Sequence, residues 1–335
     1  GQGRFVLDGT PRMRQRPIAP LLDALAQLGA AAQSRDGTGC PPVVVEAGGL
    51  PGGECAVRGD LSSQFLSALL MAGPCAARGV TVRLIGELVS RPFVGTTRAV
   101  MEAFGATVRP EGDGAGERFV VEPGGYRGRD YAIEPDATAA SYFFAAAALT
   151  GGTVRVSGLG RDSTQGDLAF VDVLAGMGCA VEFDAEGVTV RGPARLAGID
   201  VDLGPLSDTA QTLAAIAPFA DGPTTMRGLA HTRHQETDRL AAVTTELRRL
   251  GGRVDERADG LTIYPAALRG GTVATYDDHR MAMSFALIGL RIPGVRIADP
   301  GCVAKTFPDF FARFAALSVE RGSFAPLEDT PRNPE

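Results

Sequence analysis

The stretch Arg249–Glu256, RLGGRVDE, ends an amphipathic run at Gly251 and continues into alternating polar and apolar residues. A glycine after the last apolar residue of such a run predicts a helix end, and the alternation predicts a strand. The same junction recurs at Gly29 in QLGAAAQ, Gly105 in AFGATVRP and Gly178 in GMGCAVEF, at intervals of 76, 73 and 73 residues. A fixed interval between such junctions indicates an internally repeated architecture.

A second marker has nearly the same period, and it is an acidic residue that opens a helix rich in small residues. These acids are Asp60, Asp136, Asp208 and Asp278, at intervals of 76, 72 and 70 residues. After each of these helices we expect a short strand, at 81–84, 153–156, 224–227 and 295–297. A second amphipathic helix and two strands then complete a βαβαββ-like unit of about seventy residues, which predicts an α/β (α+β) fold.

The chain ends differ from the complete unit. The first unit keeps only its second helix, at 18–28, and its strands, while the last unit ends with a helix at 308–317. We expect a truncated N-terminal-type domain at 1–134, a C-terminal-type domain at 135–320 and a disordered tail at 321–335. The first residue is Gly rather than Met, so we also expect a fragment or a processed chain.

Composition excludes several classes of protein. A chain of 335 residues with 44% hydrophobic residues can bury two cores, and no apolar run reaches membrane-spanning length. The net charge of −6 argues against a nucleic-acid surface. Five scattered cysteines without a CxxC pair are typical of reduced thiols, and we expect a cytoplasmic location.

The densest cluster of reactive side chains is His234–Arg239, HQETDR, directly before an amphipathic run that ends at Gly251. We expect this cluster on the first turn of a helix, where backbone N–H groups favour anions. Glu236 and Arg239 are three apart and would share one face of that turn. The competing interpretation is a solvated helix start with capping acids.

Other candidates have equally plain alternatives. Three arginines in PRMRQRP, including Arg12, suit bidentate binding of carboxylate or phosphate, or else form a basic loop. Ser62-Ser63-Gln64 forms a phosphate or polyol cradle, or else an ordinary N-cap. Asp208 is a cap or a general base, and Lys305 is an anion ligand or a solvated lysine. The three histidines do not have the spacing of a zinc site, so no metal is expected.

These motifs together resemble the enolpyruvyl transferase family, and within it the EPSP synthases. The matching stretches are PRMRQRP, SSQFLSALLM, PDATAASYF, HQETDR, DDHRMAM and CVAKTFPDF, in the order of the family and across residues 4 to 317. The resemblance implies a two-domain inside-out α/β barrel, in which each domain has three βαβαββ copies about a pseudo-threefold axis. One domain would be incomplete in this chain, and the active site would lie in the cleft between the domains.

The resemblance also implies a reaction. The family transfers the enolpyruvyl group of phosphoenolpyruvate to the 5-hydroxyl of shikimate 3-phosphate and releases phosphate, in the pathway to chorismate and the aromatic amino acids, without a cofactor. Shikimate 3-phosphate would contact Ser62, Ser63, Gln64, Ser90, Asp208, His231 and Gln235. Phosphoenolpyruvate would contact Arg12, Gln64, Arg239, Arg280 and Lys305. Asp208 would be the general base, Glu236 the acid, and Lys305 a further catalytic residue. Both partners are small molecules, nucleic acid and membrane are not expected as partners, and we expect a monomer.

Three positions depart from the family pattern. Phe93 replaces a common Tyr, Gln235 replaces a common Lys or His, and His231 replaces a common Asn. The N-terminal segment of the family, which carries substrate-binding residues, would precede Gly1. We therefore expect that the 335-residue chain alone turns over poorly.

Two other functions compete with this interpretation. The UDP-N-acetylglucosamine enolpyruvyl transferases share the fold, but SSQF, ETDR and KTFP together favour shikimate 3-phosphate as the acceptor. A catalytically dead binding module is the other alternative. The presence of Arg12, Asp208, Glu236, Arg239, Arg280 and Lys305 argues against decay of the site.

Overall fold

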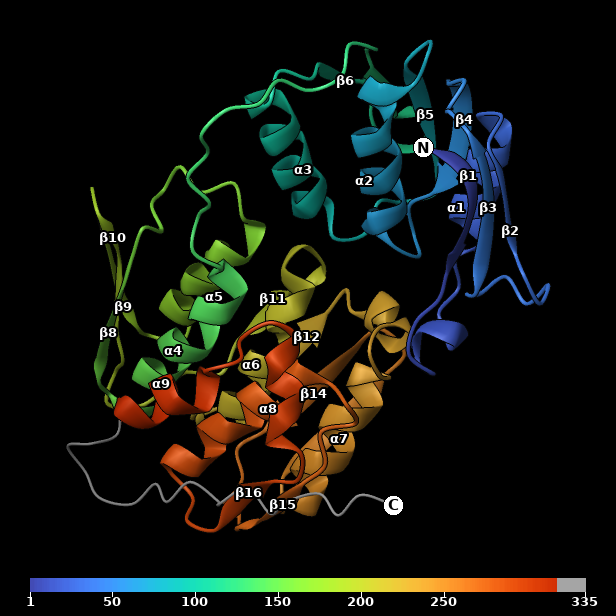
Figure 1. The fold of residues 1–335 in the computed structure, drawn as a ribbon. Helices are drawn as coiled ribbons and strands as arrows, with labels where there is room; N and C mark the ends of the chain where they lie inside the picture. The colour runs from blue at the N-terminus through green and yellow to red at the C-terminus, as the bar shows by residue number, and fades with distance from the viewer. Residues whose placement is uncertain (318–335) are drawn as a thin grey trace.

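The structure is a computed structural model that describes residues 1–317, so the expected tail at 321–335 lies outside the described residues. Its helices and strands form two bodies that face each other across a gap, one above the other in Figure 1. Residues 8–17 descend from the upper body toward the lower one, and residues 122–136 connect the upper body to the lower one (Figure 1). No helix among the described residues is both long and apolar enough to cross a bilayer.

The upper body, which we call the N-terminal half, contains two sheets and three α-helices. The sheets have the strand orders β1-β3-β2 and β4-β5-β7-β6. The strands are β1 (Gln2–Leu7), β2 (Ala31–Ser34), β3 (Val43–Gly48), β4 (Gly53–Arg58), β5 (Val80–Ile85), β6 (Val108–Glu111) and β7 (Arg118–Val121). The helices are α1 (Ala19–Gln27), α2 (Ser63–Ala72) and α3 (Arg91–Ala103).

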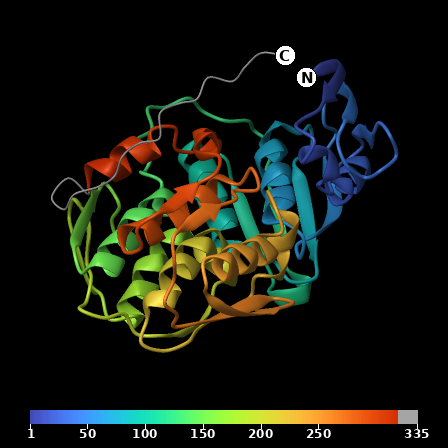
Figure 2. The ribbon, with the colours of Figure 1, turned by 90° about the horizontal axis from the view of Figure 1, so that it is seen from below.

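Within residues 1–317, the lower body, which we call the C-terminal half, contains three sheets, with strand orders β8-β10-β9, β11-β12-β14-β13 and β15-β16. Its helices are α4 (Ala137–Thr150), α5 (Phe170–Gly176), α6 (Ala210–Ile216), α7 (Arg239–Arg249), α8 (His279–Ala286) and α9 (Phe310–Ala316). Its strands are β8 (Thr153–Ser157), β9 (Ala180–Asp184), β10 (Gly187–Arg191), β11 (Asp200–Asp202), β12 (Thr224–Arg227), β13 (Arg253–Arg257), β14 (Gly260–Tyr264), β15 (Gly271–Val273) and β16 (Val295–Ile297). Seen from below, the sheets lie around the helices (Figure 2).

The repeated unit is present in both halves. The order β4–α2–β5–α3–β6–β7 matches β11–α6–β12–α7–β13–β14, with α6 preceded by the short 3-10 helix η5 (Gly204–Thr209). In each unit the first two strands pair in parallel and the last two form an antiparallel hairpin. The strands expected at 224–227 and 295–297 have those bounds, and the other two are one or two residues longer. The predicted α/β architecture of βαβαββ units is therefore confirmed.

Each half has its own hydrophobic core. One cluster runs from Ala24 to Val121 and the other from Ala137 to Phe314. In the C-terminal half α6 contacts both α4 and α8, and α4 contacts the 3-10 helix η8 (Leu287–Leu290) that follows α8. These inner helices are rich in Ala because close helix packing requires small side chains at the contact. The domain boundary expected near residue 134 is a prediction that the two cores support.

Candidate active site

The cluster His234–Arg239 forms a loop and a helix start instead of a complete helical turn. His234 ends the 3-10 helix η7 (Ala230–His234), and α7 begins only at Arg239. Asp238 is the N-cap, because its carboxylate accepts a hydrogen bond from the Ala241 N–H at 3.0 Å. The expectation that the whole cluster lies on the first helical turn is therefore wrong. Glu236 precedes the cap, although it does pair with Arg239, three residues later.

Arg239 is the centre of the charged cluster. Its guanidinium is almost fully buried and lies 2.9 Å from the nearest carboxylate oxygen of each of Asp208, Glu236 and Asp278. It also donates to the side-chain carbonyl of Gln235. A guanidinium has five N–H donors in a rigid plane, so one arginine can hold several carboxylates in fixed positions.

Two more cations complete this cluster. Arg280, at the start of α8, lies 2.7 Å from the second oxygen of Asp208, and Lys305 pairs with the second oxygen of Glu236. Each of the two candidate catalytic carboxylates, Asp208 and Glu236, is therefore held between two cations. Asp208 does not cap a helix, so the capping alternative is wrong for this residue, and its role as a general base stays a prediction. By contrast, Asp136 and Asp278 do cap α4 and α8, as expected for Asp136.

The pKa values of the two acids reflect this pairing. Burial alone would raise the pKa of Glu236, but Arg239 and then Lys305 outweigh burial and hold that pKa well below its usual range. Burial also opposes ionisation of Asp208, and Arg280 and Arg239 outweigh it and lower its pKa. Both acids are thus carboxylates in the ligand-free cleft, and a change in their cation partners would change their basicity.

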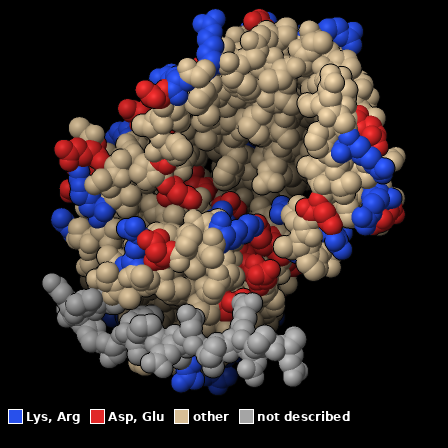
Figure 3. Space-filling view, in the orientation of Figure 1, with Lys and Arg blue, Asp and Glu red and all other residues tan. Residues whose placement is uncertain are grey.

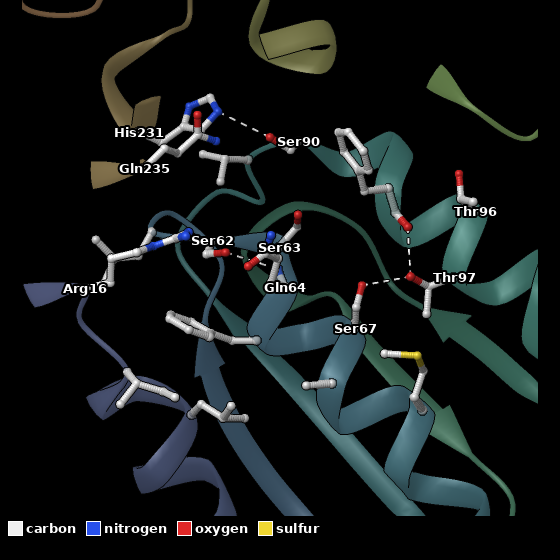
Figure 4. Close-up of a pocket in the computed structure, with 18 of the residues that line it drawn as sticks. Arg16, Ser62, Ser63, Gln64, Ser67, Ser90, Thr96, Thr97, His231 and Gln235 are labelled. Atoms are coloured by element: carbon white, nitrogen blue, oxygen red, sulfur yellow. Dashed lines mark hydrogen bonds between the residues drawn. The ribbon is translucent and has the colours of Figure 1, made fainter. Parts of the chain in front are cut away.

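The polar residues expected to hold a phosphate line a cavity of about 860 Å³ between the halves. Ser62, Ser63 and Gln64 lie at the N-terminus of α2, where the Ser62 hydroxyl accepts from the Gln64 N–H at 3.2 Å (Figure 4). Ser62 is therefore an N-cap that also lines the cavity, so the N-cap interpretation is confirmed and the phosphate cradle stays a prediction. Backbone N–H groups and hydroxyls converge there, as in many phosphate sites.

Ser90 connects the two halves from the next loop. It has a left-handed backbone, with φ of 49°, and its hydroxyl lies 3.3 Å from the Ser207 hydroxyl. The same hydroxyl lies 3.2 Å from His231 Nε2 (Figure 4). A serine in that conformation carries backbone strain that the surrounding contacts must offset. Burial lowers the pKa of His231, which favours a neutral imidazole.

The three arginines of PRMRQRP have three different partners. Arg12 donates to the backbone carbonyl of Gln235 at 3.0 and 2.7 Å, across the gap between the halves. Arg16 lines the cavity and lies 4.0 Å from a Glu236 oxygen. Arg14 instead pairs with Asp8, on the exposed surface. The sequence analysis gave a substrate-binding role to Arg12, which stays a prediction, and gave no role to Arg16, because the spacing alone does not show which arginine faces inward.

The predicted residues fall into two adjacent groups. The hydroxyl and amide group, Ser62, Ser63, Gln64, Ser90, His231 and Gln235, lines the cavity. The charged group, Arg12, Glu236, Arg239, Arg280 and Lys305, lies beside it, and Asp208 and Gln235 contact both groups. Figure 3 shows the hollow between the halves, with acidic and basic side chains gathered along its lower wall.

Other residues of the site had only weak signals in the sequence. Asp278 was noted as a helix opener, yet it also holds Arg239, 39 residues away in the chain. Phe93, one of the three departures from the family pattern, lines the cavity beside Thr97.

Among the described residues, no group of three or more His, Cys, Asp and Glu side chains could hold a metal ion. All five cysteines are free.

Comparison with known proteins gives consistent results. Residues 1–314 match the family model described as EPSP synthase (3-phosphoshikimate 1-carboxyvinyltransferase). The chain is 50% identical over 319 residues to the 3-phosphoshikimate 1-carboxyvinyltransferase of Edwardsiella ictaluri and 47% identical over 315 residues to that of Nostoc punctiforme. Both alignments cover 94% of this chain and 73% of the relative.

A plant relative and a solved structure extend the comparison. The chloroplastic 3-phosphoshikimate 1-carboxyvinyltransferase of Brassica napus is 48% identical over 323 residues, which cover 93% of this chain and 62% of the relative. The solved structure of EPSP synthase from Acinetobacter baumannii superposes with a TM-score of 0.75 at 26% identity. That superposition covers 96% of this chain and 74% of the other.

Proposed function

The chain belongs to the EPSP synthase family, and from that premise we propose which of its residues carry out the family's reaction. The reaction transfers the enolpyruvyl group of phosphoenolpyruvate to the 5-hydroxyl of shikimate 3-phosphate and releases phosphate. The observation that supports the proposal is the cluster in which Arg239, Arg280 and Lys305 pair with Asp208 and Glu236 beside a cavity lined by hydroxyls.

The cations suit phosphoenolpyruvate. The two substrates together carry about five negative charges, because each has a carboxylate and a phosphate. In the ligand-free cleft Arg239, Arg280 and Lys305 are paired with protein carboxylates, so a bound substrate would exchange one set of anions for another. Arg12, Arg239, Arg280 and Lys305, with the Gln64 amide, would then bind the carboxylate and phosphate of phosphoenolpyruvate.

Shikimate 3-phosphate suits the polar side of the cavity. Ser62, Ser63 and Gln64 would bind its phosphate at the N-terminus of α2, together with the Ser90 hydroxyl. His231, Gln235 and Asp208 would contact its ring hydroxyls, since they line the same cavity. Phe93 has no hydroxyl to offer to this substrate, although its ring lies on the cavity wall.

The exchange of anions also accounts for the two protonation roles. Phosphoenolpyruvate would draw Arg239 and Lys305 away from Glu236, which would raise the pKa of that acid and allow it to protonate the enol carbon. Asp208 would remain a carboxylate and accept the proton of the 5-hydroxyl. Addition and elimination need such an acid and base, held on separate elements, as Glu236 and Asp208 are.

A phosphate-release assay tests the function. The chain is expected to release phosphate from phosphoenolpyruvate only when shikimate 3-phosphate is present, and not with UDP-N-acetylglucosamine as acceptor. Release with the sugar nucleotide alone would favour the other enolpyruvyl transferases. Equal release by the wild-type chain and the Asp208→Ala variant would favour a dead binding module. The measured rate also tests the prediction that the 335-residue chain turns over poorly.

Three further assignments are proposals of the same kind. A division near residue 134 is supported by the two separate cores, and limited proteolysis that cleaves first between 122 and 136 would support it.

The expected monomer is tested by light scattering of the purified chain. The expected cytoplasmic location rests on the five free cysteines, and fractionation of the source cells tests it.

A further inference from the structure

Glu246 is a fully buried carboxylate on α7, two turns after Arg239, and it does not line the cleft. Its two oxygens accept hydrogen bonds from the Ala274 N–H at 3.1 Å and the Tyr276 hydroxyl at 2.7 Å. Arg249 lies 3.3 Å away and provides its positive partner. Burying a carboxylate is unfavourable unless it is paired and hydrogen-bonded. An apolar side chain would fill this position at lower cost, so the presence of a carboxylate here points to a role in holding its hydrogen-bond donors.

Glu246 holds a strained turn. Tyr276 and Asp277 are consecutive residues, both with φ of 56°. This is the left-handed region of backbone conformation, which residues other than glycine rarely adopt. Such a backbone persists only where neighbouring contacts determine it. Burial and then the Glu246 carboxylate raise the pKa of Tyr276 to about 12, so its hydroxyl stays protonated and donates a hydrogen bond to Glu246.

The strained turn leads directly into the charged cluster. Asp278 follows it, and one oxygen of Asp278 caps α8 at the Arg280 N–H, at 2.9 Å. The other oxygen accepts from Arg239 Nε, at 2.9 Å. The contacts therefore close a ring from Arg239 along α7 to Glu246, through the turn to Asp278, and back to Arg239. The part of the ring along α7 spans about 10 Å of rigid helix.

We propose that Glu246 is a positioning residue: by holding the turn at 274–277 it sets Asp278, and through Asp278 it sets the spacing of the Arg239 and Arg280 guanidiniums for phosphoenolpyruvate. This inference rests on the proposed roles of those two arginines. A misplaced guanidinium weakens anion binding strongly, because bidentate contacts depend on geometry. Shikimate 3-phosphate, held mainly at α2, depends much less on this ring.

The Tyr276→Phe variant tests the proposal, since it removes one hydroxyl and keeps the ring. The KM for phosphoenolpyruvate is expected to rise about tenfold, while the KM for shikimate 3-phosphate stays within about twofold. Tyr264→Phe is the matched control. Its hydroxyl also donates to a carboxylate, Asp255, at 2.8 Å in the same half, but on the outer hairpin of β13 and β14. That variant is expected to leave both KM values unchanged.

Glu246→Gln adds a graded variant, because it keeps the shape but retains only one acceptor oxygen. Its effect on the KM for phosphoenolpyruvate is expected to equal or exceed that of Tyr276→Phe. A merely structural role predicts a different result, with a lower melting temperature in both variants and no selective change in the KM for phosphoenolpyruvate. That outcome would overturn the proposal.

Hydrogen exchange separates this proposal from the proposed function. In Tyr276→Phe the amides of residues 274–280 are expected to exchange at least about tenfold faster, while those of α2 and α4 do not change. If the wild-type chain releases no phosphate and yet this local change occurs, the assigned reaction fails and the positioning of Asp278 stands. Unchanged exchange at residues 274–280 would reject the positioning role whatever the activity.

Discussion

The helices α2 and α4 occupy equivalent places in the repeated unit but have different surroundings. Almost every residue of α4 is buried, because it contacts α5, α6 and η8. One side of α2 contacts α1, α3 and the sheet, while its other side, with Met71 51% exposed, faces the cavity. The comparison shows that a helix of small and apolar residues predicts close neighbours without showing which of its faces they cover.

The two halves also differ in the kind of side chain that each supplies to the cleft. The C-terminal half supplies Asp208, Glu236, Arg239, Arg280 and Lys305 from four separate segments, already paired with one another. The N-terminal half supplies mainly hydroxyls and amides from the start of α2 and the loop before α3. Ion pairs therefore fix the side chains on the C-terminal side of the cleft. On the N-terminal side, the backbone at the start of α2 and in the loop before α3 places the polar groups.

The largest expected effect comes from breaking the charged side. Arg239→Leu leaves three carboxylates without their common partner and is expected to destabilise the C-terminal half by about 3–5 kcal/mol. Phosphate release is expected to fall at least about 100-fold. Denaturant unfolding and the release assay measure both changes. Arg155→Leu is the control, because its pair with Asp184 is exposed and is worth less than about 1 kcal/mol.

Arg239→Lys separates the two consequences. Lysine keeps the charge but has no planar fork, so we expect stability to recover in part while activity stays low. Full recovery of activity would show that charge alone matters at this position, and would contradict the argument from geometry.

The contrast between α4 and α2 predicts the next effect. Ala145 on α4 is fully buried, so Ala145→Leu is expected to destabilise the protein by about 1–3 kcal/mol through overpacking. Ala68 on α2 lines the cavity, and Ala68→Leu is expected to cost less than about 0.5 kcal/mol. Urea unfolding of both variants measures the difference. Equal costs would show that the two helices are equally surrounded in solution.

The last expected effect is on the pH dependence of stability, because two buried groups of the C-terminal half change it in opposite directions and leave a small net effect. Burial and then Arg280 lower the pKa of His279 from 6.5 to about 4. Between these values the unfolded chain binds a proton that the folded chain refuses, so His279 makes stability fall as the pH falls from about 6.5 to 4. Burial and then Asp208 raise the pKa of Asp167 from 3.8 to about 6, so its effect has the opposite sign: its favourable contribution is lost as the pH rises from about 4 to 6.

The two effects partly cancel between pH 4 and 6, and single variants separate them. Unfolding measured across that range is expected to show a shallower loss of stability on acidification in His279→Asn and a steeper loss in Asp167→Asn. Each difference corresponds to about one bound proton. Shifts in the same direction in both variants would contradict the assigned pKa directions.

The sequence predicted the repeated unit well because its markers are local. A glycine after an amphipathic run, as at Gly251, and an acid before a small-residue helix, as at Asp136, depend on a few neighbouring residues. The fold class and the strand at 224–227 followed from these patterns.

The site was harder to predict because its contacts are long-range. Asp136 and Asp208 look alike in the sequence, yet only Asp136 caps its helix, while Asp208 faces two arginines that lie 31 and 72 residues away. The family resemblance implied a site role for Asp208, which periodicity could not separate from that of Asp136. Neither signal separated Arg16, which faces the cavity, from Arg14, which faces solvent.

The bond from Arg12 to Gln235 has a consequence for how freely the site can vary. The acceptor is the main-chain oxygen of residue 235, so the bridge between the halves does not depend on which side chain stands there. Substitution at this position is therefore expected to leave the hydrogen bonds between the halves in place, although it removes the side-chain contact with Arg239. The main chain of residue 235 thus links the two halves, while its side chain belongs to the charged cluster, so the two contacts can be changed independently.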